Sequence, residues 1–502
     1  MNVVFIATAT AYLIALPASI FPASGAVVTT LPNDSRPQSA PSSVAFEPYT
    51  AKGAGGKQLQ GELGRIQVPE NRSKNNGKKL ELAFVRFKST NPNPGPPIFY
   101  LVGGPGPSGI EHCVAPATGR LLSLLDYGDV IGLDQRGTGK SKPNLEEGAK
   151  FEYSLPLDRA TSRENLVTAY SAAAKRAVAH WTANGVDLSA FNTNENADDV
   201  EDLRRALGLG KIITWGESYG THLTLAFLRR HPGSVERSIM IRVEGPDNTW
   251  KLPSTYQQSL EQLHRLVADD PGVHAKMPDF MGSVKALLSQ LKEKPAVVDI
   301  EDQGKNVKVT VGSFDLQYYL ANSLGLAFEM RDIPKRIHQM QQGDFTTLAR
   351  FALEYRRSDL GSAMALMMDC ASGATPARLQ RIHKEAADPV NLLGNAANTP
   401  FPELCAACGS PDLGDSFRNK FKCDVPVLFV SGDLDAKTPP SNVDEVSGGF
   451  TNHTHILVRN AAHESIEMLS ADYRKLLKEF LLGAKVASGE VVLPTPKFRA
   501  IE

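Results

Sequence analysis

Three side chains, widely separated in the 502-residue chain, could together perform nucleophilic catalysis. Ser218 is the centre of a Gly-x-Ser-x-Gly pentapeptide at 216–220, and Asp435 and His463 follow it in that order. A serine hydroxyl is a poor nucleophile until a base takes its proton, and an imidazole base needs an acid that fixes its tautomer. These residues predict Ser218 as nucleophile, His463 as base and an aspartate as acid. Asp433 competes with Asp435 for the acid role, and the spacing leaves both open.

The sequence around Ser218 indicates a strand, a sharp turn and a helix. Residues 212–215 are mostly apolar β-formers, and residues 221–230 have a helical pattern. Such a turn holds its central residue in a strained backbone conformation and points the side chain off the top of the sheet. Glycines at 216 and 220 leave room for close chain crossings. The pattern is typical of an exposed nucleophile.

A second loop could stabilise the negative charge of a reaction intermediate. The fully apolar run 98–102 is typical of a strand buried in a parallel sheet, and Gly-Gly-Pro-Gly follows it at once. Glycine lets a backbone N–H approach a ligand closely. We expect the N–H groups of Gly104 and Tyr219 to form an oxyanion hole.

The remaining elements predict an α/β fold with a doubly wound, mostly parallel sheet. A hairpin (59–68 with 80–87) leads into strands that alternate with helical runs. The candidate acids follow the strand 425–430, and His463 follows the strand 455–458. Both therefore belong at the carboxyl edge of the sheet, where open α/β sheets bind ligands.

The chain divides into five predicted segments. Its apolar start, followed by small residues, is typical of an export signal, and a Pro- and Ser-rich stretch comes next. Helical patterns dominate a long middle region, with one hairpin (297–300 with 307–311). We predict a signal peptide at 1–26, a flexible leader at 27–45, a core at 46–249 and 422–502, and an inserted, mainly helical cap at 250–421. The mature protein is expected in the periplasm or outside the cell, without a membrane span.

Composition excludes some partners. The 54 basic and 55 acidic residues nearly cancel, which argues against nucleic-acid binding.

The odd number of cysteines, five, leaves at least one thiol unpaired. The single C-x-x-C at 405–408 has no second pair, so we expect a structural disulfide in the middle region rather than zinc. The predicted chemistry requires no metal or cofactor, and the sequence predicts no particular oligomeric state.

These motifs resemble a known family. Segments 103–106, 134–141, 216–221 and 432–439, together with His463, look like the α/β-hydrolases of the proline iminopeptidase and tripeptidyl aminopeptidase group, especially the secreted bacterial tripeptidyl-aminopeptidase-like branch. The resemblance covers about residues 55–485. It implies an α/β-hydrolase fold and selects Asp435 over Asp433. Val102 and Ala462 depart from the His and Gly that many relatives carry there.

The predicted function is that of an exported serine hydrolase acting through an acyl-enzyme. The resemblance implies an aminopeptidase that releases residues or short peptides from free peptide N-termini. Such an enzyme needs a carboxylate for the substrate ammonium. Glu244 and Asp247 are candidates, with structural roles as the favoured interpretation of both. The alternatives are a carboxylesterase on small or acyl-chain esters and a non-catalytic binding protein on a hydrolase fold.

Overall fold

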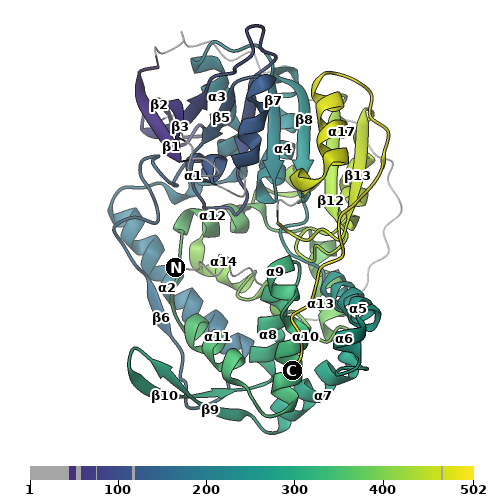
Figure 1. The fold of residues 1–502 in the computed structure, drawn as a ribbon. Coiled ribbons are helices and arrows are strands. Elements are labelled where there is room, and N and C mark those ends of the chain that lie inside the picture. The colour runs from purple at the N-terminus through teal and green to yellow at the C-terminus, as the bar shows by residue number, and fades with distance from the viewer. Residues whose placement is uncertain (1–43, 53–57, 75, 116–118, 465–466) are drawn as a thin grey trace, which may run out of the picture.

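The computed structural model describes residues 44–52, 58–74, 76–115, 119–464 and 467–502. The predicted export signal lies outside these ranges, as does the predicted leader up to residue 43. A sheet with its flanking helices forms one part of the molecule, and a mostly helical region forms the other (Figure 1). None of the helices in the described ranges combines the length and the apolar character that a membrane span requires.

The core is built on one large sheet. Among the described residues it has ten strands in the order β1-β2-β3-β5-β4-β7-β8-β12-β13-β14. The pairs from β1 to β5 are antiparallel, and all pairs from β5 to β14 are parallel. The strands are β1 (Phe46–Lys52), β2 (Gln58–Pro69), β3 (Lys79–Phe87), β4 (Ile98–Leu101), β5 (Val130–Leu133), β7 (Ile212–Glu217), β8 (Val235–Ile241), β12 (Val427–Gly432), β13 (His453–Arg459) and β14 (Gly489–Val492).

The expected fold class and the β2–β3 hairpin are confirmed. Strands β4, β5, β7 and β12 are buried along their whole length, because helices cover both faces of a parallel sheet. Helix α4 is buried along most of its length, as a helix with apolar residues on several faces must be. The helices around the sheet are α1 (Gly109–Val114), η2 (Gly119–Asp126), α3 (Thr193–Ala206), α4 (Tyr219–Arg230), η4 (Pro232–Ser234), α16 (Ser441–Ser447), η6 (Glu467–Leu469) and α17 (Ala471–Leu481).

The mostly helical region lies between β8 and β12 in the chain, and we call it the cap. Its helices are α5 (Pro253–Asp269), α6 (Pro271–His274), α7 (Phe280–Glu293), α8 (Ser313–Ser323), α9 (Ala327–Met330), α10 (Ile333–Gln341), α11 (Thr346–Arg356), α12 (Ala363–Ser372), α13 (Pro376–Ala387), η5 (Ala396–Asn398), α14 (Glu403–Cys408) and α15 (Asp415–Arg418). The predicted hairpin is present as β9 (Ala296–Asp302) and β10 (Lys305–Val311).

Part of the chain before β7 also packs with the cap. Helix α2 (Arg163–Ala183) lies against α14, and β6 (Glu152–Ser154) pairs with β11 (Arg357–Asp359). The short helix η3 (Leu188–Ala190) then leads into α3. The cap therefore receives elements from two stretches of sequence. The limits 46–249, 250–421 and 422–502 stay a prediction.

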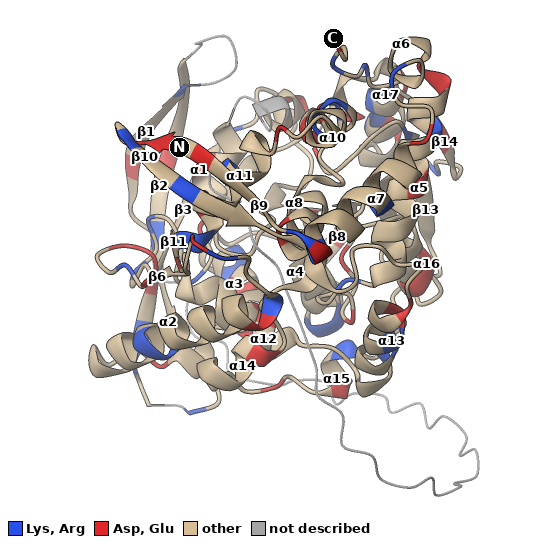
Figure 2. Cartoon of the chain, turned by 90° about the horizontal axis from the view of Figure 1, so that it is seen from below, with Lys and Arg blue, Asp and Glu red and all other residues tan. Residues whose placement is uncertain are grey.

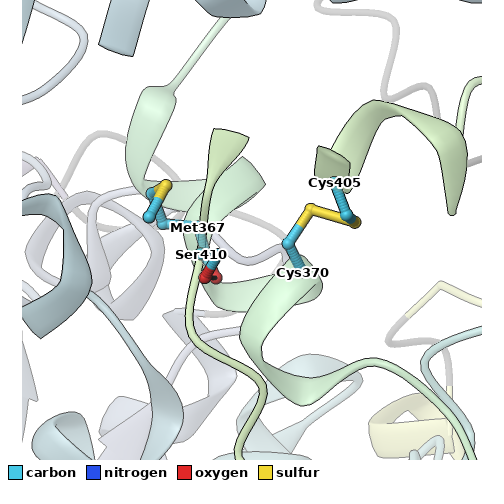
Figure 3. Close-up of a disulfide and its surroundings, with 4 residues drawn as sticks. All are labelled: Met367, Cys370, Cys405 and Ser410. Atoms are coloured by element: carbon cyan, nitrogen blue, oxygen red, sulfur yellow. Dashed lines mark hydrogen bonds between the residues drawn. A yellow bond between two sulfur atoms is a disulfide. The ribbon is translucent and has the colours of Figure 1, made fainter. Parts of the chain in front are cut away.

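A disulfide joins two cap helices. Cys370 of α12 is bonded to Cys405 of α14, and nearby Ser410 donates a hydrogen bond to the carbonyl of Met367 at 3.0 Å (Figure 3). The sequence predicts a disulfide in this middle region, and the structure adds its pairing. The other three cysteines are free and buried. In the described ranges, His, Cys, Asp and Glu side chains form no group of three or more that could hold a metal ion.

Charges of both signs are interspersed over the elements (Figure 2). Two ion pairs are fully buried, Arg136–Asp199 at 2.7 Å in the core and Arg356–Asp315 at 2.6 Å in the cap. Asp134, two residues before Arg136, forms no part of these ion pairs. It accepts hydrogen bonds from one hydroxyl and two backbone N–H groups. Asp134 and Arg136 therefore hold the chain in place and do not contact the candidate catalytic residues.

The turn between β7 and α4 has the backbone predicted for it. Ser218 has φ 53° and ψ −125°, a conformation that costs a non-glycine residue on the order of 1–3 kcal/mol. A Cβ on Gly220 would lie 1.9 Å from the carbonyl oxygen of Leu101. The strand β4 thus crosses the start of α4 where only glycine fits.

Replacing Gly220 by alanine should therefore destabilise the protein. We expect Gly220→Ala to lower the free energy of unfolding by roughly 1–3 kcal/mol, because the backbone of β4 must shift. Gly233→Ala is the matched control, since a Cβ there meets nothing within 4 Å. It should change the free energy by less than about 1 kcal/mol. Denaturant unfolding of both variants measures this, and equal stabilities would contradict the close crossing.

Candidate active site

The structure brings Ser218, His463 and Asp435 together. The Ser218 hydroxyl lies 3.0 Å from Nε2 of His463, and Nδ1 of the same ring lies 2.7 Å from Oδ2 of Asp435. With Nδ1–H donating to the carboxylate, Nε2 is free to accept the serine proton. Ser218 is the N-cap residue of α4, whereas the other two residues follow β12 and β13. All three lie at the carboxyl edge of the sheet.

Asp435 is held as an anion. Its Oδ1 accepts hydrogen bonds from the N–H groups of Lys437 and Thr438 at 2.8 and 2.9 Å, and its Oδ2 accepts one from the Thr438 hydroxyl at 2.7 Å. Burial alone would raise the pKa of Asp435, but His463 and these hydrogen bonds lower it to about 2. The carboxylate is therefore ionised across the neutral range and can fix the tautomer of His463.

Asp433 lies elsewhere. Its Oδ1 accepts a hydrogen bond from the N–H of Asn460 at 2.7 Å, and its Oδ2 lies 3.6 Å from Arg459. The side chain thus braces the turn after β13 from the neighbouring strand. Of the two aspartates that the sequence left open, Asp435 is the one in contact with His463.

The glycine-rich loop after β4 packs against the candidate nucleophile. A Cβ on Gly103 would lie 2.8 Å from the carbonyl oxygen of Glu217 and 2.9 Å from Cβ of Ser218. Gly104 follows with φ 123°, and Tyr219 is the first residue of α4. The loop and the start of the helix thus flank Ser218. The roles of the Gly104 and Tyr219 amides as oxyanion donors stay a prediction.

Neither acidic residue considered from the sequence is free for a ligand. Glu244 forms an ion pair of 2.7 Å with Lys251, and Asp247 accepts hydrogen bonds from the backbone and hydroxyl of Thr375, the N-cap of α13. A cavity of about 230 Å³ beside Asp247 is lined by none of the three candidate catalytic residues.

A third carboxylate belongs to Asp369 of α12. Its side chain makes no hydrogen bond or ion pair with the described residues, and it is half-buried although deep in the protein. Within α12, Asp369 and Ala365, one turn earlier, are half-buried, whereas the other residues are buried. Ala365 lies 3.5 Å from where a Cβ on Gly106 would be, so this face of α12 opens beside the glycine-rich loop.

The surroundings of Asp369 disfavour the charged form of its carboxyl group. Burial raises its pKa well above the ordinary value, the charge of Glu244 raises it further, and Lys251 opposes both. Asp369 also interacts electrostatically with Tyr219, the residue after Ser218. Sequence patterns did not identify Asp369, because it lies in an apolar helix without a motif. Its single charge among the apolar residues of α12 was the available signal.

Curated relatives of this chain are peptidases by name. A tripeptidyl aminopeptidase of Streptomyces coelicolor is 28% identical over 437 residues, which cover 81% of this chain and 77% of that protein. The serine protease Hip1 of Mycobacterium tuberculosis is 27% identical over 190 residues, 35% of each chain. A proline iminopeptidase of Neisseria meningitidis is 28% identical over 153 residues, 30% of this chain and 34% of that protein.

A family model extends over most of the chain. The model of the alpha/beta hydrolase fold matches residues 96–467, a range that includes Ser218, Asp435 and His463. The sheet order and the turn at Ser218 agree with this match. The chain therefore belongs to the alpha/beta hydrolase fold family.

Proposed function

We propose that this hydrolase is a serine aminopeptidase that works through an acyl-enzyme and releases residues or short peptides from free peptide N-termini. The observation that carries the proposal is the hydrogen-bonded chain from the Ser218 hydroxyl through His463 to Asp435. The intact chain of three reacting groups argues against a binding protein that has lost turnover.

The reaction follows from this geometry. Ser218 Oγ attacks the substrate carbonyl carbon while its proton passes to Nε2 of His463, and the carbonyl oxygen becomes an oxyanion facing the Gly104 and Tyr219 amides. The C–N bond then breaks, and the leaving amine takes the proton from Nε2. Water attacks the resulting ester and gives one proton to His463. The acid leaves as Ser218 recovers that proton.

We attribute the enzyme's proposed preference for free peptide N-termini to Asp369. An ammonium group pairs well with a carboxylate that has no hydrogen bond or ion pair within the described part of the chain. Asp369 lies on the solvent-contacting face of α12 beside the glycine-rich loop, where the amino end of a bound peptide could reach it. The names of the relatives support the same class of substrate.

We also propose that the protein is exported. The apolar stretch at 1–26 supports this, and so does the Cys370–Cys405 disulfide, since disulfides persist mainly in oxidising compartments.

Removing the Ser218 hydroxyl should abolish covalent catalysis. We expect a fluorophosphonate probe to label the wild-type protein and Ser441→Ala, which alters an exposed serine outside the site, but not Ser218→Ala. Intact-protein mass spectrometry measures the adduct. Labelling of Ser218→Ala would assign the chemistry to another residue.

Peptide anilides with free N-termini should be hydrolysed faster than N-acetylated ones, whereas turnover of nitrophenyl esters alone would favour the carboxylesterase.

Removing the charge of Asp369 should weaken the binding of amines. We expect Asp369→Asn to lower kcat/KM for a free-amine anilide by roughly 10- to 100-fold, the value of a hydrogen bond to a charged group. The effect on a nitrophenyl ester without an amine should be small. Asp158→Asn, an exposed aspartate without a hydrogen-bonding partner, is the control. Equal losses on both substrates would remove Asp369 from amine recognition.

The pH dependence gives a second test of Asp369. Because burial raises its pKa, the carboxyl is neutral at acid pH and gains its charge as the pH rises through that raised value. In the wild type, kcat/KM for the free-amine substrate should therefore rise over a range where the ester shows no change. This rise of kcat/KM with pH should be absent in Asp369→Asn. Glu244 and Lys251, which face Asp369, are retained in both proteins.

A further inference from the structure

Arg242 is a buried cation that contacts two catalytic segments directly. Its Nη2 lies 2.5 Å from Oε2 of Glu217, the residue before Ser218, and its Nη1 lies 3.5 Å from Oε2 of Glu467, four residues after His463. Its exposed fraction is 4%. The guanidinium therefore lies between the turn at Ser218 and η6, the short helix that begins at Glu467.

The backbone of Arg242 joins the third segment. Its N–H donates to the carbonyl of Val430 at 2.8 Å, and Val430 belongs to β12, the strand that leads to Asp435. The charge of Arg242 also interacts with Asp435 itself. Arg242 thus contacts the residue before Ser218, the strand that leads to Asp435 and the short helix η6, which begins four residues after His463.

The conformation of Arg242 is strained. Its φ is 59°, in the left-handed region that a long side chain rarely adopts. Glycine would adopt this backbone at no steric cost, yet the position carries the largest cationic side chain. Strain of this kind persists only where surrounding contacts compensate for it, and it clusters at functional sites. Here the compensating contacts are the two carboxylates.

We propose that Arg242 is a positioning residue that sets the separation of Ser218 and His463 by holding Glu217 and Glu467 on one guanidinium. Two like-charged carboxylates at this depth would repel each other without a cation between them. The loss of Arg242 would let η6, which carries Glu467, move relative to the turn at Ser218. This inference rests on the proposed acyl-enzyme mechanism, because its effect is on the acylation step.

The position permits a test by chemical rescue. Arg242→Gly suits the left-handed backbone and leaves a space the size of a guanidinium group. We expect the acylation rate constant of active Arg242→Gly to fall by about 10- to 100-fold, because a reacting group is misplaced. The KM of this variant for a nitrophenyl ester should change less than twofold. Guanidinium chloride at tens of millimolar should restore the rate of Arg242→Gly, whereas equal sodium chloride should not.

Two further variants separate positioning from stability. Arg242→Lys keeps a charge and should retain more activity than Arg242→Gly, while lacking the fork that reaches both carboxylates. Arg356→Met breaks a buried ion pair in the cap, and it should lose stability without a change in acylation rate per active protein. Active protein is counted by fluorophosphonate titration, and unfolding is followed separately.

Four outcomes decide the matter. Rescue by guanidinium confined to Arg242→Gly supports the proposal. The proposal is overturned if Arg242→Gly has the wild-type rate constant. It is also overturned if guanidinium does not restore the lost rate and Arg356→Met shows the same loss. Both results leave the serine mechanism standing. Failure of the wild-type protein to react with fluorophosphonate overturns the proposed function and this inference together.

Discussion

The left-handed backbone at Ser218 is the constraint on which the rest of the site depends. It projects the hydroxyl from the end of β7, and it exists only because β4 can cross the start of α4 at a glycine. The parallel sheet then fixes where β12 and β13 end, so that Asp435 and His463 converge on the same edge. A reactive geometry assembled from three distant segments thus follows from strand order and one strained turn.

The cap contacts this edge of the sheet at two places. Gly325, between α8 and α9, accepts a hydrogen bond from the N–H of His463 at 2.7 Å, and α12 lies beside the glycine-rich loop. The disulfide from Cys370 to Cys405 ties α12 to α14, which in turn packs on α2. The helix that carries Asp369 is therefore anchored to its neighbours by a covalent bond as well as by packing. Substrate selection can change with the cap while the reacting groups stay on the sheet.

Local patterns were sufficient for the sheet and for the candidate triad, because each of these leaves a short signature: an apolar run, a glycine-rich turn or a polar residue just after a strand. They were insufficient for Asp369 and Arg242. The role of each depends on partners that are distant in sequence, such as Glu467 for Arg242, or on the lack of any partner, as for Asp369. The pairing of Cys370 with Cys405 is equally tertiary, since Cys408 lies on the same helix as Cys405.

Arg242 and Asp369 are two buried charged groups with different proposed roles, one in positioning and one in ligand binding. Arg242 is surrounded by carboxylates and sealed from solvent, so its charge is balanced within the protein and holds segments in place. Asp369 is equally deep but retains solvent contact and forms no ion pair with the residues that the structure describes. An unpaired charge at such depth is costly in the empty site and becomes favourable when a ligand supplies the opposite charge. Folding thus tolerates Asp369 at a cost that binding of an ammonium group would recover.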